Sequence, residues 1–185
     1  MNETNIDIVP PKLAEVMVTI EGITSLLCSR KPDDIGKKAS PEKDEEVRYL
    51  ASLYLKQNGK DVFPAIAIKR SAIDAAHTFA TSITKTRARG AFDIPVDWIE
   101  IQGDKPNKRV DDGNNPNKRG AAIKIVRAEF KKWKMQFPLI YDINGPLTID
   151  QILNLVNMAG WYVGIGAFRP AKNGKHGKFK IIETK

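Results

Sequence analysis

The sequence predicts an α+β fold in which two helices cover one face of an antiparallel sheet. Apolar residues recur with helical spacing in residues 64–79 and in residues 148–160. Segments in which apolar residues alternate precede, separate and follow these two helices. Hydrophobic residues make up 42% of the 185 residues, which is enough for one packed core, so we expect a single domain over residues 1–185.

The first predicted strand lies within residues 15–28, where apolar side chains alternate up to Gly22, which marks a bulge or a bend. Residues 1–12 precede this strand as a flexible arm. A short inserted helix is expected over residues 42–53. A small hairpin follows this helix, because the Asn-Gly pair at residues 58–59 favours a type I′ turn.

The first main helix begins at Pro64, a residue that the first turn of a helix accepts. Its apolar side chains share one face, and Lys69 and Arg70 lie off that face. A strand is predicted after this helix over residues 97–102, with Trp98 and either Ile99 or Ile101 pointing into the core.

A basic segment, residues 82–90, lies between that helix and that strand. Lys85, Arg87 and Arg89 occupy every second position in it. Alternate side chains of an extended chain project to the same side, so these three would form a row of phosphate contacts. The alternative interpretation is a mobile basic loop.

Residues 103–120 predict a basic finger loop that protrudes from the domain. They contain Pro-Asn-Lys-Arg twice, and an Asp-Gly turn signal lies between the two copies. The basic pairs of these copies are Lys108-Arg109 and Lys118-Arg119. A loop of this length in a compact domain is typically functional or disordered. We expect the finger to be disordered when free and ordered on a partner.

Two further strands are predicted over residues 121–130 and 133–141. Lys131-Lys132 forms the turn between them, so we expect the two strands to pair with each other. Pro138 lacks a backbone N–H and therefore indicates an edge or a bulge.

The second main helix begins at Thr148, which forms a capping-box pattern with Gln151. Gly160 is predicted to be the left-handed cap at the end of this helix. A short strand over residues 161–165 and a closing strand over residues 179–182 complete the chain.

The resulting order is strand, helix, strand, strand, helix, strand. This is the βαββαβ order of a ferredoxin-like or RRM-like core, here with an inserted helix, a hairpin and the basic finger. RNA-recognition modules of this plan bind RNA on the sheet face that the helices leave open. We therefore expect the corresponding face to be available in this chain.

Composition limits the function classes further. The chain has 30 Lys and Arg against 22 Asp and Glu, a net charge of +8, which favours an anionic partner such as nucleic acid. The single cysteine, Cys28, excludes an internal disulfide and favours a reducing compartment. The sequence has neither an apolar run of about 18 residues nor a signal-peptide pattern, so we expect a cytoplasmic protein without a membrane partner.

The sequence also lacks the patterns of common catalytic and cofactor sites. It contains no Cys/His metal cluster, no dinucleotide fingerprint and no spacing typical of a nucleophile with its base. We therefore expect no metal, no cofactor and no enzymatic activity.

A glycine-rich basic loop spans residues 164–178, and we call it the Gly loop. Its cations are Arg169, Lys172, Lys175 and Lys178. Glycines let a backbone approach another chain closely, and exposed N–H groups beside cations suit a phosphate oxygen. The alternative is a solvated hairpin tip with ordinary surface lysines.

Two segments carry a family resemblance. VGIGAFRPAKNGKHGKF resembles the C-terminal glycine-rich loop of the RAMP superfamily, the RNA-binding subunits of CRISPR effector complexes. The matching residues are Gly164, Gly166, Arg169, Gly174, Gly177 and Phe179. VFPAIAIKRSAIDAA resembles that family's strand–Pro–helix segment, in which a basic residue at the helix start faces RNA, and Lys69 and Arg70 occupy this place. The chain also resembles small proteins of tailed phages with the same order of elements.

The resemblance implies a non-catalytic protein, of phage origin, that coats single-stranded DNA or RNA as a RAMP-like homo-oligomer or filament. Phe168 and Phe92 are candidates for stacking on bases. The candidate nucleic-acid-binding residues are Lys69, Arg70, Lys85, Arg87, Arg89, Lys108, Arg109, Lys118, Arg119, Gly164, Gly166, Phe168, Arg169, Lys172, Lys175, His176 and Lys178.

Two alternative functions stay open at this point. The chain would mimic or bind a subunit of a host CRISPR-type ribonucleoprotein, in which case its basic surface engages that partner. Because some RAMP proteins cut RNA with a histidine, the resemblance also allows a metal-independent endoribonuclease that uses His176 as a general acid or base.

Overall fold

The structure is a computed structural model that describes residues 10–30, 44–54, 56–76, 78–80, 82–114 and 122–185. Its main sheet is antiparallel, with the spatial order β10-β1-β9-β4, and β6 pairs with one end of β9. The strands of this sheet are β1 (Leu13–Gly22), β4 (Phe92–Asp93), β6 (Gln102–Gly103), β9 (Trp133–Asp142) and β10 (Phe179–Thr184).

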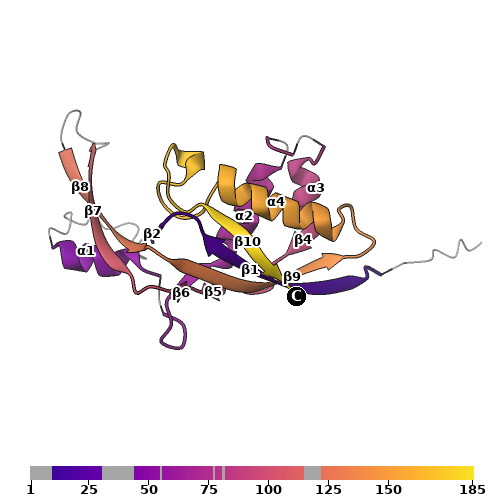
Figure 1. Cartoon of the computed structure of the whole chain (residues 1–185), viewed down its shortest axis with the longest axis horizontal. Coiled ribbons are helices and arrows are strands. Elements are labelled where there is room, and N and C mark those ends of the chain that lie inside the picture. The colour runs from indigo at the N-terminus through magenta and orange to yellow at the C-terminus, as the bar shows by residue number, and fades with distance from the viewer. Residues whose placement is uncertain (1–9, 31–43, 55, 77, 81, 115–121) are drawn as a thin grey trace, which may run out of the picture.

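Helices α2 (Ala65–Ala75) and α4 (Ile149–Tyr162) pack together on one face of the main sheet, and α3 (Lys85–Ala91) lies beside them (Figure 1). In the chain, α2 lies between β1 and β4, and α4 lies between β9 and β10. The sheet therefore has the fourth, first, third and second strands of a βαββαβ unit side by side. This arrangement confirms the predicted ferredoxin-like core.

Strand β9 supplies the middle of the core. Its side chains alternate as predicted, and the buried ones are Trp133, Met135, Phe137 and Leu139. On the side away from β1, β9 pairs with β6 at residues 133–134 and with β4 at residues 140–141. Pro138 lies between these two stretches, where the described residues give β9 no partner on that side, so its missing N–H leaves no hydrogen bond unmade.

The second helix begins as predicted but ends later. Thr148 and Gln151 form both hydrogen bonds of the capping box. The helix then continues through Gly160, so the prediction of a cap there and of a strand over residues 161–165 is wrong. The left-handed residue is Gly164, with φ +67°. A Cβ on Gly160 would clash with the carbonyl oxygen of Phe179, so this glycine serves the contact of α4 with β10.

The second strand of the core is β4 and not the predicted segment 97–102. In that segment β5 (Trp98–Glu100) pairs with β3 (Val62–Pro64) in a separate two-stranded sheet. The register places Ile99 in the core, so the alternate side chain of Trp98 points outward and is 40% exposed. The type I′ turn is present, because Asn58 and Gly59 both have positive φ.

A second sheet, of order β2-β8-β7, lies at the other end of the molecule (Figure 1). Its strands are β2 (Leu26–Cys28), β7 (Asn107–Asn114) and β8 (Ala122–Phe130), and α1 (Glu45–Ser52) packs against it. The predicted pairing of residues 121–130 with residues 133–141 is therefore wrong. The chain bends at Lys131-Lys132 and passes from this sheet into the main sheet.

The finger is a protruding hairpin and not a loop along its whole length (Figure 1). Strand β7 pairs with β8 over its full length, and β2 pairs with the other edge of β8 at residues 128–130, so β8 is not available to β9. The guanidinium of Arg109 contacts the carboxylates of Asp111 at 2.8 Å and Glu129 at 3.1 Å, and these contacts help to hold the polar β7 sequence in a sheet. The tip of the finger, residues 115–121, lies outside the described residues.

The close contact of α4 with β10 generates a prediction. A Gly160→Ala variant should lose about 1–3 kcal/mol of unfolding free energy, because its methyl group has no room against the backbone of Phe179. The matched control is Gly90→Ala in α3, where a Cβ would have nothing within 4 Å. This control should be neutral or stabilising by up to about 1 kcal/mol. Urea unfolding measures both values, and equal stability of the two variants would contradict the packing described.

Candidate nucleic-acid interface

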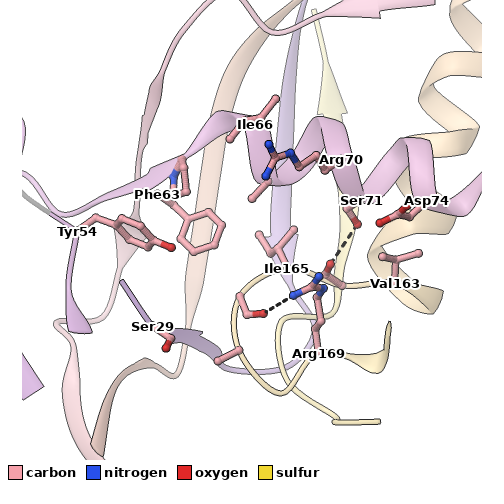
Figure 2. A pocket seen from close by; sticks show the side chains of 15 residues that line it. Ser29, Tyr54, Phe63, Ile66, Arg70, Ser71, Asp74, Val163, Ile165 and Arg169 are labelled. Atoms are coloured by element: carbon pink, nitrogen blue, oxygen red, sulfur yellow. Dashed lines mark hydrogen bonds between the residues drawn. The ribbon is translucent and has the colours of Figure 1, made fainter. Parts of the chain in front are cut away.

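Residues from both segments that carry the family resemblance line one pocket. Arg70 reaches it from α2, and Gly164, Gly166 and Arg169 reach it from the Gly loop (Figure 2). The pocket has a volume of about 410 Å³. The fold therefore brings together two basic side chains that lie far apart in the sequence.

Hydrogen bonds attach the Gly loop to α2 and β2 and orient one of its cations. The hydroxyl of Ser71 donates to the carbonyl oxygen of Gly164 at 3.1 Å, which ties the loop to α2 (Figure 2). The backbone N–H of Ala167 donates to Leu27 at 2.9 Å, which ties it to β2. The guanidinium of Arg169 donates to the carbonyl oxygen of Gly166 at 3.1 Å, which orients this side chain within the loop.

The glycines of the loop bring the chain close to its own backbone. A Cβ on Gly174 would clash with the carbonyl oxygen of Phe168, and a Cβ on Gly177 would clash with that of Ile165. The N–H groups of Gly174 and Gly177 donate to backbone carbonyls within the chain. These two glycines therefore shape the loop, and their N–H groups are not directed toward a phosphate.

The cations of the loop differ in their surroundings. Lys172 and Lys175 are exposed. The ammonium of Lys178 lies 4.1 Å from the ring centroid of Trp161, which is a cation–π contact. Trp161 is 51% exposed, and Tyr162 stacks on Phe79 with ring centroids 4.3 Å apart. The sequence prediction missed these exposed aromatic rings because it assigned residues 161–165 to a strand.

Several other predicted cations are paired within the chain. Lys69 donates a hydrogen bond to Asp93 at 2.9 Å, which lowers the pKa of that carboxyl. Lys108 contacts Glu46 at 3.2 Å. The hydrogen bonds from Arg109 likewise hold the pKa of Asp111 below its usual range. Lys118 and Arg119 lie outside the described residues.

The predicted row of Lys85, Arg87 and Arg89 does not form. These residues lie in α3, whose N-cap Thr84 accepts a hydrogen bond from the N–H of Arg87 at 3.2 Å. Successive residues of a helix are about 100° apart, so every second residue points to nearly opposite sides. Lys85 contacts Asp74 at 3.2 Å, whereas Arg87 donates to the carbonyl oxygen of Pro146 at 2.6 Å.

His176 is largely inside the molecule. Its side chain is 7% exposed, and its Nδ1 lies 2.8 Å from the hydroxyl oxygen of Ser25. Burial lowers the pKa of this histidine, and the nearby charge of Arg109 adds to the effect. The structure thus gives His176 a structural role between the Gly loop and the turn that follows β1.

The two phenylalanines proposed for stacking have different environments. Phe92 is 4% exposed and belongs to the core, so it presents no ring face to a base. Phe168 lies on the Gly loop with its ring centroid 4.3 Å from the guanidinium carbon of Arg127. Its backbone is left-handed, with φ +49°, which is uncommon for a bulky residue.

The sheet face opposite the helices has a mixed charge. Glu21 contacts Lys134 at 3.1 Å and Lys180 at 3.8 Å across neighbouring strands. Among the described residues of this face no side chain is aromatic. The face therefore lacks the stacking rings with which RNA-recognition modules bind bases.

The described residues give little support to a metal site or a reactive cysteine. They contain no group of three His, Cys, Asp or Glu side chains placed to hold a metal ion. Burial raises the pKa of Cys28 to about 12, so this thiol stays protonated. No described helix combines the length and apolar character that crossing a membrane requires.

Known proteins share the fold but little sequence. No protein-family model and no curated protein matches the sequence. A chain in the cryo-EM structure of the type III-B Cmr-beta complex bound to cognate target RNA is similar with a TM-score of 0.64 and 12% identity, over 94% of this chain and 60% of that one. Cmr6 from Pyrococcus furiosus is similar with a TM-score of 0.51 and 13% identity, over 92% of this chain and 99% of that one.

These similarities show a RAMP-like fold, as the resemblance of the two sequence segments implied. The chain spans 60% of the length of the Cmr-beta chain that it matches.

The burial of His176 generates a prediction about pH. Its pKa in the folded protein is below the ordinary value of 6.5, so the unfolded chain binds more protons in the window just below that value. The stability that this histidine contributes is complete above about pH 6.5 and decreases as the pH falls. Urea unfolding between about pH 5 and pH 7 should therefore show a shallower pH slope for His176→Gln than for the wild type. Identical slopes would contradict the burial of a neutral ring.

Proposed function

We propose that this chain binds single-stranded nucleic acid without catalysis, in the pocket between α2 and the Gly loop. The observation that carries the proposal is the convergence of Arg70 and Arg169 on this pocket. A guanidinium group presents planar N–H donors that match the oxygens of a phosphate. Two such groups on one concave surface suit successive phosphates of a strand.

The surroundings of the pocket favour a single strand over a duplex. Tyr54 lines the pocket and is half-buried. Stacking of a base on an aromatic ring contributes about 1–3 kcal/mol and requires an unpaired base. Lys172 and Lys175 lie on the same loop as Arg169 and would add phosphate contacts.

RNA is the first ligand to test. The Cmr-beta complex with a similar fold is bound to target RNA, as its description states. The absence of aromatic rings on the described part of the open sheet face supports the Gly-loop side as the binding surface.

We also propose that successive copies of the protein coat the strand and that the protein is of phage origin. Val47 and Leu50 of α1 are both exposed apolar residues at the end of the molecule that carries the finger. Such residues would suit contact with a neighbouring copy in a head-to-tail assembly. Particle size with and without a long oligonucleotide tests this assembly.

A protein partner is the second candidate. The observation that favours it is the exposed group of Phe79, Trp161 and Tyr162, because contiguous exposed apolar surface often marks a protein interface. The partner would be a subunit of a host CRISPR-type ribonucleoprotein. Capture of such a subunit from host lysate that persists after nuclease treatment would favour this candidate, and capture that nuclease abolishes would favour nucleic-acid binding.

Exchange of the two arginines tests the pocket. Arg70→Gln and Arg169→Gln should each weaken binding of labelled single-stranded RNA roughly tenfold at low salt and reduce the slope of log affinity against log salt by about one. Fluorescence anisotropy across a salt series measures both quantities, with single-stranded and duplex DNA as competitors. The control is Lys60→Gln, whose side chain contacts Glu100 at the Asn-Gly turn outside this pocket.

Unchanged affinity and salt slope in both arginine variants would contradict the pocket as the binding surface. For the same protein, we expect the RNA to stay intact after long incubation. Cleavage that disappears in a His176→Ala variant would instead support the endoribonuclease alternative.

A further inference from the structure

A charged side chain with two unbonded nitrogen atoms lies where the finger meets the Gly loop. Arg127 is in the middle of β8, and its Nε and Nη1 atoms are buried with no partner. Each of these N–H groups has lost its water without gaining an acceptor, which is unfavourable for a guanidinium. Buried donors that lack an acceptor in this way call for an explanation.

The sheet register explains why these two nitrogen atoms of Arg127 lack acceptors. Arg109 lies directly opposite Arg127 on β7, so two like charges face each other across the ladder. The carboxylates of Asp111 and Glu129 both contact Arg109, at 2.8 Å and 3.1 Å. The two acidic groups of this cluster are therefore engaged by one of the two arginines.

The ring of Phe168 lies over the guanidinium of Arg127, with 4.3 Å between its centroid and Cζ. The contact pairs a cation with the face of the ring, and it joins the Gly loop to β8. In this position Phe168 has a left-handed backbone conformation, φ +49°, which is energetically unfavourable. Arg169, the next residue, lines the pocket already described.

We propose that Arg127 binds a phosphate of the nucleic-acid strand, and that Phe168 covers it until the strand arrives. On binding, the ring of Phe168 turns away from Arg127 and stacks on a base, and the guanidinium gains phosphate oxygens as acceptors. The inference rests on the proposed function and deepens it, because it continues the strand from the pocket at Arg169 toward the root of the finger.

Bound phosphate would relieve two unfavourable features of the free protein together. The unpartnered N–H groups of Arg127 would form charge-assisted hydrogen bonds, which are stronger than those between neutral groups. Phe168 would be able to leave its left-handed conformation. An arginine that served only to hold the finger in place would instead be expected to have its N–H groups bonded in the free protein.

The Arg127→Met variant tests the proposal, because methionine keeps much of the apolar stem and removes the charge. Removing a half-buried charge whose Nε and Nη1 atoms lack acceptors should leave the melting temperature unchanged or raise it. The same variant should bind single-stranded RNA roughly tenfold more weakly at low salt and reduce the salt slope by about one. The control is Lys60→Gln, which should keep the wild-type slope.

A wild-type salt slope in Arg127→Met would overturn the inference, and so would a lower melting temperature with unchanged affinity. If the wild type binds RNA and only this expectation fails, the proposed function stands without Arg127. If the wild type binds no oligonucleotide at low salt, both fail.

A second variant, Phe168→Trp, keeps the test decisive if Arg127→Met does not fold. It places a fluorescent ring over the guanidinium, and release of that ring onto a base should change the emission when single-stranded RNA is added, beyond the change of the wild type. Equal emission changes in the variant and the wild type, at RNA concentrations that saturate both, would contradict the proposed movement.

Discussion

The candidate site depends on the close contact of the Gly loop with its own backbone. At Gly174 and Gly177 the loop passes so close to its own carbonyl oxygens that a Cβ does not fit. Gly166 approaches β2 in the same way, since its Cβ would lie 2.6 Å from the carbonyl oxygen of Leu27. This compact loop directs Arg169 toward α2 and Phe168 toward β8. The positions of both side chains thus depend on these glycines.

Net charge alone is a poor guide to where this protein binds. The chain carries a charge of +8, but cations such as Lys69, Lys85 and Lys108 contact carboxylates of the same chain. Exposed ion pairs contribute little to stability, yet they reduce the field that a phosphate meets. Arg70 and Arg169 differ from these cations, because both line a concave surface that Tyr54 also lines.

The sequence predicted the elements with strong local signals, namely the capping box at Thr148, the alternation of β9 and the two main helices. It failed where tertiary contacts decide. The polar sequence of β7 is typical of a loop, but pairing with β8 and the contacts of Arg109 hold it in a sheet. Gly160 is typical of a helix end, but here its lack of a side chain allows α4 to contact β10. At the site, Arg70 and Arg169 of the two family-like segments line one pocket, which the sequence did not predict. Arg127 was missed because a single arginine in an alternating strand carries no signal of its own.

Hydrogen–deuterium exchange of the protein with and without saturating single-stranded RNA would locate the binding surface. If the strand lies between α2 and the Gly loop as proposed, RNA should slow exchange in residues 63–71 and 163–178. Exchange in residues 15–21 and 134–140, which form the open sheet face, should change little. Slowed exchange confined to the open sheet face would contradict the account and favour an RRM-like mode of binding instead.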